Sequence, residues 1–190
     1  MSGGVAVKTL RKATQPLHDA AEQRLFAAKI MAGELSLTEY ARTLRSHHRV
    51  WASVEAWLDE SFGNAAVTAD RDLCRRMRSA LAEDLASVAF EAADAFPPDL
   101  PAAVDSPTLL GVFYVLRGSM LGGTVISRRL NESPGLATLP AYHFYAACAT
   151  EGPKTWPAFL RRLEKGVVGE RETERAVAAA RTVFEMYLID

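Results

Sequence analysis

Apolar residues recur with a helical period along nearly the whole chain, and this feature most constrains how the chain can fold. Residues 40–58 give the clearest case, with an i, i+3, i+4 stripe made of Tyr40, Leu44, His47, Trp51, Val54 and Leu58. No stretch of the sequence alternates apolar and polar residues between turn signals, as a half-buried strand would. Because 190 residues is the size of one ordinary domain, we expect a single all-α domain over residues 1–190.

Capping and breaking residues place the boundaries of the expected helices. Ser36 and Glu39 form a capping box at the start of one helix, which should end near Gly63. Ser106 followed by Pro107 predicts an N-cap and a proline in the first helical position. The further expected helices cover about 8–32, 69–88, 107–131, 141–149, 155–165 and 170–189, with a proline-rich loop (Pro97, Pro98, Pro101) before residue 106.

Charge and composition exclude several classes of protein. The formal net charge is −1, and no nucleic-acid-binding motif is present, so we expect no nucleic-acid partner. The start of the chain lacks the pattern of a signal peptide, and the longest apolar run, 109–116, is far shorter than the roughly 20 residues that a membrane span needs. Cys74 and Cys148 are far apart and predict isolated buried thiols. We therefore expect a cytoplasmic protein with no membrane association.

One face of the first expected helix carries residues suited to metal chemistry. At 100° per residue, Arg11, Thr14, His18 and Glu22 share that face. A histidine there can present one ring nitrogen to a metal, while Glu22, four residues on, holds the other and fixes the tautomer. Arg11 could pair with an anionic group about 10 Å along the helix. The alternative is a core histidine on an ordinary amphipathic helix, and Pro16 predicts a kink or a later start.

A second segment has three glycines within six residues, at Gly118, Gly122 and Gly123. Glycine inside a helix costs about 1 kcal/mol relative to alanine, so the helix should gain something from close approach to its backbone. Gly111, Gly118 and Gly122 fall on one face, flanked by Tyr114, Val115, Ser119 and Ile126. A flat ligand could lie against this face, and the helix would bend there easily. Close helix–helix packing through small residues would explain the same glycines without a ligand.

Together, the two segments resemble those of bacterial haem oxygenases. The first reads Leu-Arg-x-x-Thr-x-x-x-His-x-x-x-Glu, and about 100 residues later the second reads Tyr-Val-Leu-x-Gly-Ser-x-Leu-Gly-Gly. Chain length and the order of the expected helices are also similar to that family, so the resemblance covers nearly the whole chain. It implies a haem-oxygenase-like multi-helix bundle in one domain.

The resemblance implies a role for individual residues. His18 would be the axial ligand of haem iron, and Gly118, Ser119 and Gly122 would be the catalytic residues on the opposite face of the haem. Arg11 would bind a propionate, with Arg161 as a second basic partner and Arg162 as its alternative. The remaining implied haem-binding residues are Thr14, Glu22, Tyr114, Val115, Gly123 and Phe184, the last as an aromatic wall.

The implied activity is oxidative cleavage of haem to biliverdin, carbon monoxide and ferrous iron. Haem would be both prosthetic group and substrate, dioxygen the co-substrate, and Ser119 would hold ordered water in place of a strong distal acid. Electrons would come from a ferredoxin or a flavin reductase, which could dock at Lys12, Arg24 and the Arg161/Arg162 pair. Two alternatives stay open: a non-catalytic haem carrier or sensor of the same fold, and a relative that binds an organic ligand without iron.

Several residues depart from the family pattern or compete with it. Arg117 stands where relatives often carry glutamate, and on a helical wheel it points about 100° away from Gly118. Phe113 replaces a tyrosine that touches a propionate in other relatives, and Tyr114 could substitute for it. Of His47 and His48, one ring should face the core and the other solvent, and His143 should pack in an aromatic cluster. The paired Glu-x-x-His motifs of a di-iron bundle are absent.

Overall fold

A computed structural model describes residues 4–61, 67–96, 99–101, 105–140 and 142–189. These residues form helices and connecting segments, with no strand in any of the described ranges, which confirms the all-α prediction. The helices are α1 (Val5–Arg24), α2 (Ala27–Ala32), α3 (Leu37–Ser61), α4 (Thr68–Ser87), α5 (Ser106–Ser119), the 3₁₀ turn η2 (Met120–Gly122), α6 (Gly123–Glu132), α7 (His143–Gly166) and α8 (Glu170–Met186).

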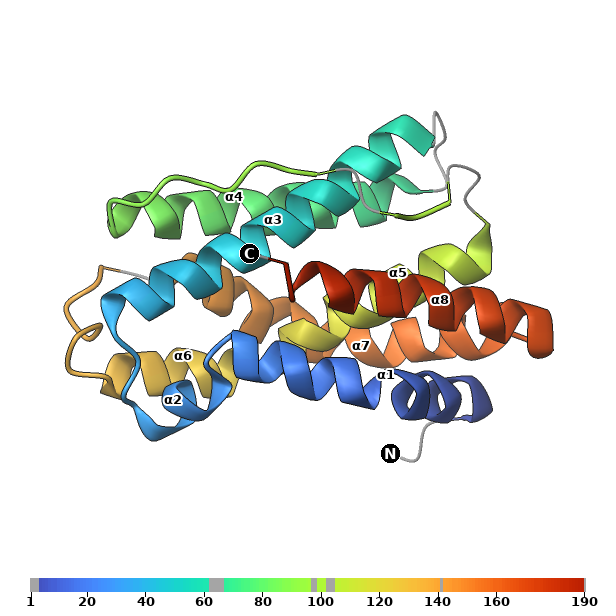
Figure 1. The fold of residues 1–190 in the computed structure, drawn as a ribbon, viewed down its shortest axis with the longest axis horizontal. Coiled ribbons are helices and arrows are strands. Elements are labelled where there is room, and N and C mark those ends of the chain that lie inside the picture. Colours follow the sequence, from blue (N-terminus) through green and yellow to red (C-terminus); the bar gives the residue numbers. More distant parts are fainter. Residues whose placement is uncertain (1–3, 62–66, 97–98, 102–104, 141, 190) are drawn as a thin grey trace.

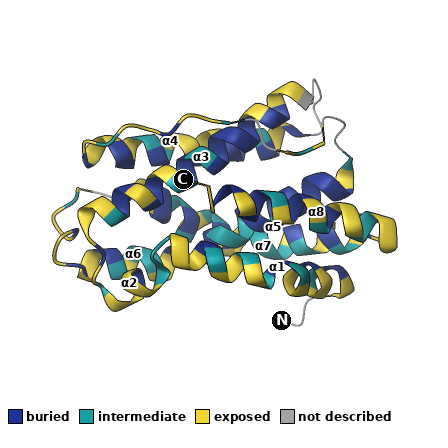
Figure 2. Cartoon of the chain, in the orientation of Figure 1, coloured by how far each residue is buried: buried dark blue, intermediate teal, exposed yellow. Residues whose placement is uncertain are grey.

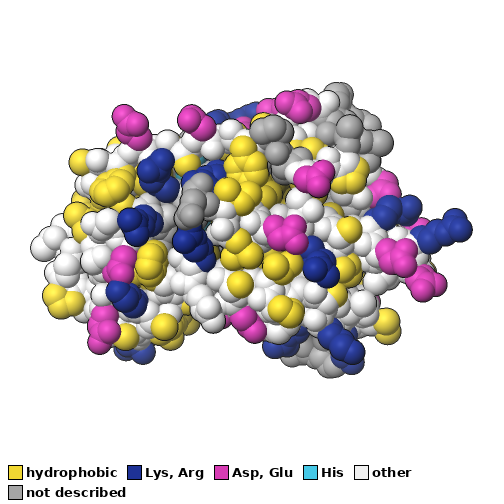
Figure 3. Space-filling model, viewed as in Figure 1, with side chains coloured by type: hydrophobic (Ala, Val, Ile, Leu, Met, Phe, Trp, Pro, Cys, Tyr) yellow, Lys and Arg dark blue, Asp and Glu magenta, His cyan; other side chains and the backbone are white. Residues whose placement is uncertain are grey.

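The helices are arranged in two groups around one apolar core (Figure 1). The antiparallel pair α3 and α4 lies along one side, and α1, α5, α7 and α8 lie on the other. The short helices α2 and α6 close one end. Buried residues follow the inward faces of the long helices, and α1 turns a mostly exposed face outward (Figure 2). On the face seen in Figure 3, cationic and anionic side chains are interspersed and no single sign dominates.

The first expected helix is in fact two helices. α1 ends at Arg24, and the chain turns at Phe26, whose φ of 55° is in the left-handed region, before α2 begins at Ala27. Gly33 then ends α2, also with a positive φ, as predicted. Pro16 lies inside α1 without ending it. Since Lys12, four residues before it, is exposed, water can satisfy the carbonyl that the proline leaves unpaired.

The glycine-rich helix begins one residue earlier than expected, and it bends. Asp105 is the N-cap, and its side chain accepts a hydrogen bond from the amide of Thr108 at 2.9 Å, so the prediction of Ser106 as cap was wrong by one position. After Ser119 the helix tightens into η2 and resumes as α6 at Gly123. The predicted bend at the glycines is therefore present. The predicted end of α3 near Gly63, the loop residues Pro97 and Pro98 and residue 141 lie outside the described residues.

The two short helices expected at 141–149 and 155–165 are one helix, α7, which runs through Pro153 and Pro157. Gly152, between the two segments, is buried, and a Cβ there would lie 2.8 Å from the carbonyl oxygen of Met120. The glycine therefore lets α7 approach η2 closely. α7 stays helical across both prolines, which the local sequence did not predict.

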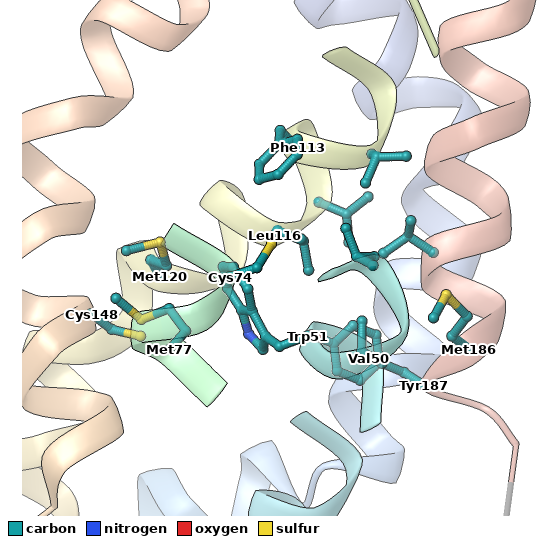
Figure 4. Packing of buried hydrophobic residues seen from close by; sticks show 14 of the residues in the cluster. Val50, Trp51, Cys74, Met77, Phe113, Leu116, Met120, Cys148, Met186 and Tyr187 are labelled. Atoms are coloured by element: carbon teal, nitrogen blue, oxygen red, sulfur yellow. The ribbon is translucent and has the colours of Figure 1, made fainter. Parts of the chain in front are cut away.

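The core beside η2 is rich in sulfur. Figure 4 shows Met77, Met120 and Cys148 close together, with Cys74 nearby, between α4, α5 and α7. Both cysteines are free and fully buried, as the sequence predicted. By length and composition, Ser106–Glu132 could cross a membrane, but half of that window is buried among the other helices. It is the bent α5–η2–α6 unit and has the character of a core helix.

Candidate functional site

A cavity of about 720 Å³ opens between α1 and α5, within the size range of small-molecule sites. α1 supplies one wall and α5 with η2 supplies the other, while side chains from α3, α7 and the α8 end close it. Among its lining residues are Lys8, Arg11, Thr14, Gln15, His18, Glu22, His47, Tyr114, Val115, Gly118, Ser119, Leu121, Gly122, Tyr145, Trp156, Leu160, Phe184 and Tyr187. The structure thus brings the two sequence segments to opposite sides of one cavity.

His18 faces this cavity from α1, with 47% of its side chain exposed. Its Nε2 lies 3.8 Å from Oε1 of Glu22, and its Nδ1 lies 3.7 Å from Oδ1 of Asp19. Either carboxylate can therefore approach the protonated nitrogen while the other nitrogen serves as a ligand atom. Glu22 was expected in this role, and Asp19 was missed. Phe184 crosses the imidazole edge-on, with 5.8 Å between ring centroids, and forms the expected aromatic wall.

α1 is held in place by a carboxylate from a distant helix. Glu164 of α7 accepts hydrogen bonds from the amides of Ala6 (3.2 Å) and Val7 (2.9 Å) in the first turn of α1. A negative charge at this end also suits the helix dipole. Leu10 is fully buried below, and the Thr14 hydroxyl donates to its carbonyl at 2.8 Å. This anchoring fixes the direction in which His18 points.

The glycines of the α5 segment divide into two kinds. A Cβ added at Gly118 would meet only the Trp156 ring, at 3.8 Å, and one at Gly122 would meet only the flexible Ile126 side chain, at 3.2 Å. Gly111 instead contacts the backbone of Ala176 on α8, and a Cβ at Gly123 would lie 2.6 Å from the Ala149 nitrogen. Gly118 and Gly122 therefore expose backbone to the cavity, whereas Gly111 and Gly123 allow neighbouring helices to pack closely. Gly123 was expected to contact haem and does not line the cavity.

One end of the cavity is cationic. Lys8 and Arg11 line it on α1, and among the described residues neither has a carboxylate within ion-pair distance. Tyr114 lies opposite, half-buried, with its ring 6.0 Å from that of Trp156. Burial raises the pKa of Tyr114, and the nearby Arg11 partly offsets this rise. This end is suited to carboxylates, with Arg11 as predicted and Lys8 as an addition.

The cavity is also lined by buried polar groups that the sequence did not reveal. These are His47, Tyr145 and Tyr187. The His47 Nδ1 lies 3.2 Å from the Tyr187 hydroxyl, and burial lowers the pKa of His47 to about 4. His47 had been read as part of the apolar stripe of its helix, and Tyr187 follows the last helix. Only the fold brings them together.

Several predicted residues lie elsewhere. Arg161 and Arg162 line a separate surface hollow with Lys165, and Arg162 also pairs with Asp70 at 3.2 Å. Neither arginine is among the residues that line the His18 cavity, and a haem contact from Arg161 stays a prediction. Leu160 is the residue of this part of α7 that lines the cavity. Because successive residues of a helix point about 100° apart, the next residue, Arg161, points in another direction.

Arg117 points away from the cavity, as the helical wheel predicted. Its guanidinium donates to Asp70 at 2.9 Å and lies between the rings of Phe113 and Phe159, 5.7 and 5.6 Å from their centroids. Phe113 is buried with it. The arginine therefore ties α5 to α4 and α7 and does not reach the site.

Two histidine predictions were wrong. His47 and His48 are both buried, because the segment around residue 93 covers the face on which His48 lies, and the His48 Nδ1 is 2.9 Å from the Ala93 carbonyl oxygen. His143 is half exposed beside Glu83, at 3.6 Å, and is not part of the aromatic cluster.

Fold and site together define a class: an all-helical protein whose pocket sets an imidazole on one helix against bare glycine backbone on another. The sequence profile of the heme oxygenase family matches residues 5–189. A heme oxygenase from Xanthomonas campestris pv. campestris (strain 8004) is 35% identical over 153 residues, which are 80% of this chain and 88% of that protein. The chain belongs to the heme oxygenase family of enzymes.

Solved structures share the fold. The heme oxygenase of Leptospira interrogans superimposes with a TM-score of 0.73 at 21% identity, covering 97% of each chain. The heme oxygenase of Neisseria meningitidis, in its NO- and CO-bound forms, gives a TM-score of 0.69 at 21% identity, covering 96% of this chain and 88% of that one. At this identity the likeness concerns the arrangement of the helices.

Proposed function

We propose that this protein binds haem in the α1–α5 cavity and cleaves it to biliverdin, carbon monoxide and ferrous iron. One observation carries the proposal: His18 and the bare backbone of Gly118 and Gly122 line opposite walls of one cavity. A planar macrocycle fits between such walls, with its iron at the imidazole and its propionates at Lys8 and Arg11. Haem supplies the iron that binds dioxygen and the ring that is opened.

The residues of the chain perform the remaining tasks. His18 in its neutral form is the ligand, and Glu22 or Asp19 orients it by holding the protonated nitrogen. Gly118 and Gly122 bring backbone close to the opposite face and leave no side chain there to act as a strong acid. Ser119 offers a small hydroxyl that can hold water. Thr14, Tyr114 and Val115 complete the lining.

Cleavage consumes electrons, so we also propose an external donor such as a ferredoxin or a flavin reductase. Lys12 and Arg24 are exposed on α1, the helix that carries His18, and offer positive charge for its docking. We place the protein in the cytoplasm, since its two buried cysteines are free thiols.

Titration of the purified protein with hemin, followed by ascorbate or a ferredoxin reducing system in air, tests the proposal. We expect a saturable Soret band that decays into the broad absorption of biliverdin. His18→Ala should lose both signals, whereas the matched control His143→Ala, a half-exposed histidine outside the cavity, should keep them. A Soret band that persists under reductant would favour a haem carrier or sensor. No saturable Soret band would overturn haem binding and favour an iron-free ligand.

A further inference from the structure

A second hollow lies on the side of α7 that faces away from the His18 cavity. It has a volume of about 470 Å³ and is lined by Ser106, Ala158, Arg161, Arg162, Lys165 and Gly166. At 100° per residue, Arg162 and Lys165 lie about 160° and about 140° around the helix from Leu160, which lines the cavity. The cations of this hollow are therefore separate from the cationic end of that cavity.

The hollow forms where the end of α7 meets the start of α5. Gly166 allows this approach, because a Cβ there would lie 2.5 Å from Cδ1 of Leu110 and 3.4 Å from the hydroxyl oxygen of Ser106. Ser106 is the first residue of α5 and is exposed. Since the amide of a first-turn residue has no partner inside its helix, Ser106 offers the hollow two hydrogen-bond donors, its amide and its hydroxyl.

The positive charge in the hollow exceeds the negative charge around it. Among the described residues, Arg161 and Lys165 have no carboxylate within ion-pair distance. Arg162 contacts Asp70 at 3.2 Å, but Arg117 also donates to that carboxylate, at 2.9 Å, and balances its charge. Four cationic side chains therefore share one carboxylate, which leaves an excess of three positive charges.

The acidic residues beside the hollow in the chain are engaged elsewhere. Asp105, which precedes Ser106, caps α5 and pairs with Arg175 at 2.8 Å. Glu164, which precedes Lys165, accepts hydrogen bonds from two amides of α1. Neither carboxylate lines the hollow, so the excess of positive charge is not compensated by them.

The arrangement of the cations indicates the kind of anion that fits. Arg161 and Lys165 are four residues apart on one helix, where like charges repel each other unless an anion binds between them. Guanidinium groups bind phosphate oxygens in pairs, and lysine adds a point charge. From the rise of 1.5 Å per residue, the cations span about 6 Å along the helix axis, which suits two linked phosphate groups better than one.

We propose that this hollow binds the diphosphate group of a small molecule through Arg162, Lys165 and Ser106, with Arg161 at its rim. The lining has no aromatic or large apolar side chain, so it recognises the charged group and not a flat ring. Because the hollow and the His18 cavity are on different sides of α7, the anion and haem bind at the same time. The site does not depend on the function proposed above.

Calorimetric titration of the full-length protein without haem, at constant ionic strength, tests the site. We expect saturable binding of inorganic pyrophosphate and weaker binding of inorganic phosphate. Arg162→Gln and Lys165→Gln should each weaken pyrophosphate binding about tenfold, as expected for the loss of one charge-assisted hydrogen bond. The matched control Lys154→Gln removes an exposed lysine of α7 outside the hollow and should bind as the wild type does. Circular dichroism verifies that each variant is folded.

A parallel titration with ADP distinguishes the two sources of a diphosphate group. Tighter binding of ADP would identify an organic diphosphate, tighter binding of pyrophosphate would identify the free anion, and the site is supported in both cases. No saturable binding, or an equal loss in Lys154→Gln, would overturn it. Variants that bind pyrophosphate normally but are reduced more slowly by a ferredoxin would also overturn it, in favour of a protein docking surface.

Hemin titration in saturating pyrophosphate tests the location of the site. We expect the hemin affinity to be unchanged, because the two ligands bind on different sides of α7. A fall in hemin affinity would place the anion at Lys8 and Arg11 and would overturn the assignment to the hollow. Since the calorimetric titrations need no haem, a failure of haem binding and a failure of this site are observed separately.

Discussion

Gly111 and Gly118 are seven residues apart on one helix, yet their missing side chains serve different purposes. At Gly111 the backbone of Ala176 lies where a Cβ would be, so the glycine permits the close approach of α8. At Gly118 only the Trp156 ring is near, at 3.8 Å, and the space belongs to the cavity. The sequence left ligand contact and helix packing as alternatives, and the structure assigns one to each residue.

Gly118→Leu should separate binding from stability. Leucine has a higher helix propensity than glycine, by about 0.8 kcal/mol, so the free energy of unfolding should stay the same or rise. Its side chain would occupy the cavity, and we expect hemin affinity to fall at least tenfold. Urea unfolding and hemin titration measure the two quantities. The control Gly111→Ala should show the opposite pattern, with a loss of stability of about 2 kcal/mol from overpacking. Equal loss of stability in both variants would contradict this assignment.

Arg117 and Asp70 form a nearly buried ion pair between α5 and α4, with 14% and 4% of their side chains exposed. Arg117→Leu would leave the Asp70 carboxylate with Arg162 alone, and we expect it to destabilise the fold by about 3 kcal/mol. Because Arg117 points away from the cavity, the Soret band and hemin affinity of the folded variant should match the wild type. A changed haem spectrum would show that Arg117 reaches the site after all.

At the scale of the elements, two long helices begin on carboxylates supplied by other helices. Glu164 of α7 accepts from the first-turn amides of α1. Asp84 of α4 accepts from the amides of His143 (2.8 Å) and Phe144 (2.9 Å) at the start of α7. The capping box of Ser36 and Glu39, by contrast, is local, and the structure confirms it. This local capping box could be predicted from the sequence, whereas the two remote carboxylates could not.

Glu164→Ala should loosen the start of α1 and reduce haem binding from a distance. We expect a loss of about 1 kcal/mol in unfolding free energy, the usual cost of a lost cap. Since α1 carries His18 and Arg11, hemin affinity should also fall severalfold. Urea unfolding and hemin titration check both effects. The control is Glu174→Ala, an exposed glutamate on α8, which should leave both unchanged. A change in stability without any change in affinity would contradict the coupling.

The difference between local and long-range contacts also explains which helices could be predicted from the sequence. The helices α3, α4 and α8 follow from apolar periodicity and were placed within a few residues. The break at Phe26 was missed because no glycine or proline marks it. Two short helices were expected at about 141–149 and 155–165, but α7 is one helix that also contains Pro153 and Pro157.

At the scale of the whole molecule, the candidate site combines local and non-local contributions. His18, Glu22, Arg11 and the cavity glycines were found because one helix face or one motif carries them. His47 and Tyr187 were missed because they are 140 residues apart and meet only when α3 and the α8 end pack together. The burial of His47 also makes the stability of the fold depend on pH.

His47 should make the folded protein sensitive to acid. Its pKa is lowered to about 4 by burial, from 6.5 for an unperturbed imidazole, so the unfolded chain binds the proton more readily. The stabilising contribution of the neutral ring is therefore fully present above pH 6.5 and is lost as the pH falls from 6.5 towards 4. We expect His47 to account for about 2 kcal/mol of the stability lost between pH 7.5 and pH 5.0. Urea unfolding at these two pH values, followed by far-ultraviolet circular dichroism, measures the loss.

His47→Leu removes the titrating group and should reduce the difference between the two pH values by that amount, whatever its effect on stability at pH 7.5. Other groups that titrate in this range are common to both proteins and cancel in the comparison. The control His143→Gln removes a half-exposed imidazole and should keep the wild-type pH dependence. If His47→Leu were as sensitive to acid as the wild type, His47 would titrate near its ordinary pKa. The buried contact between His47 and Tyr187 would then have to be open to water.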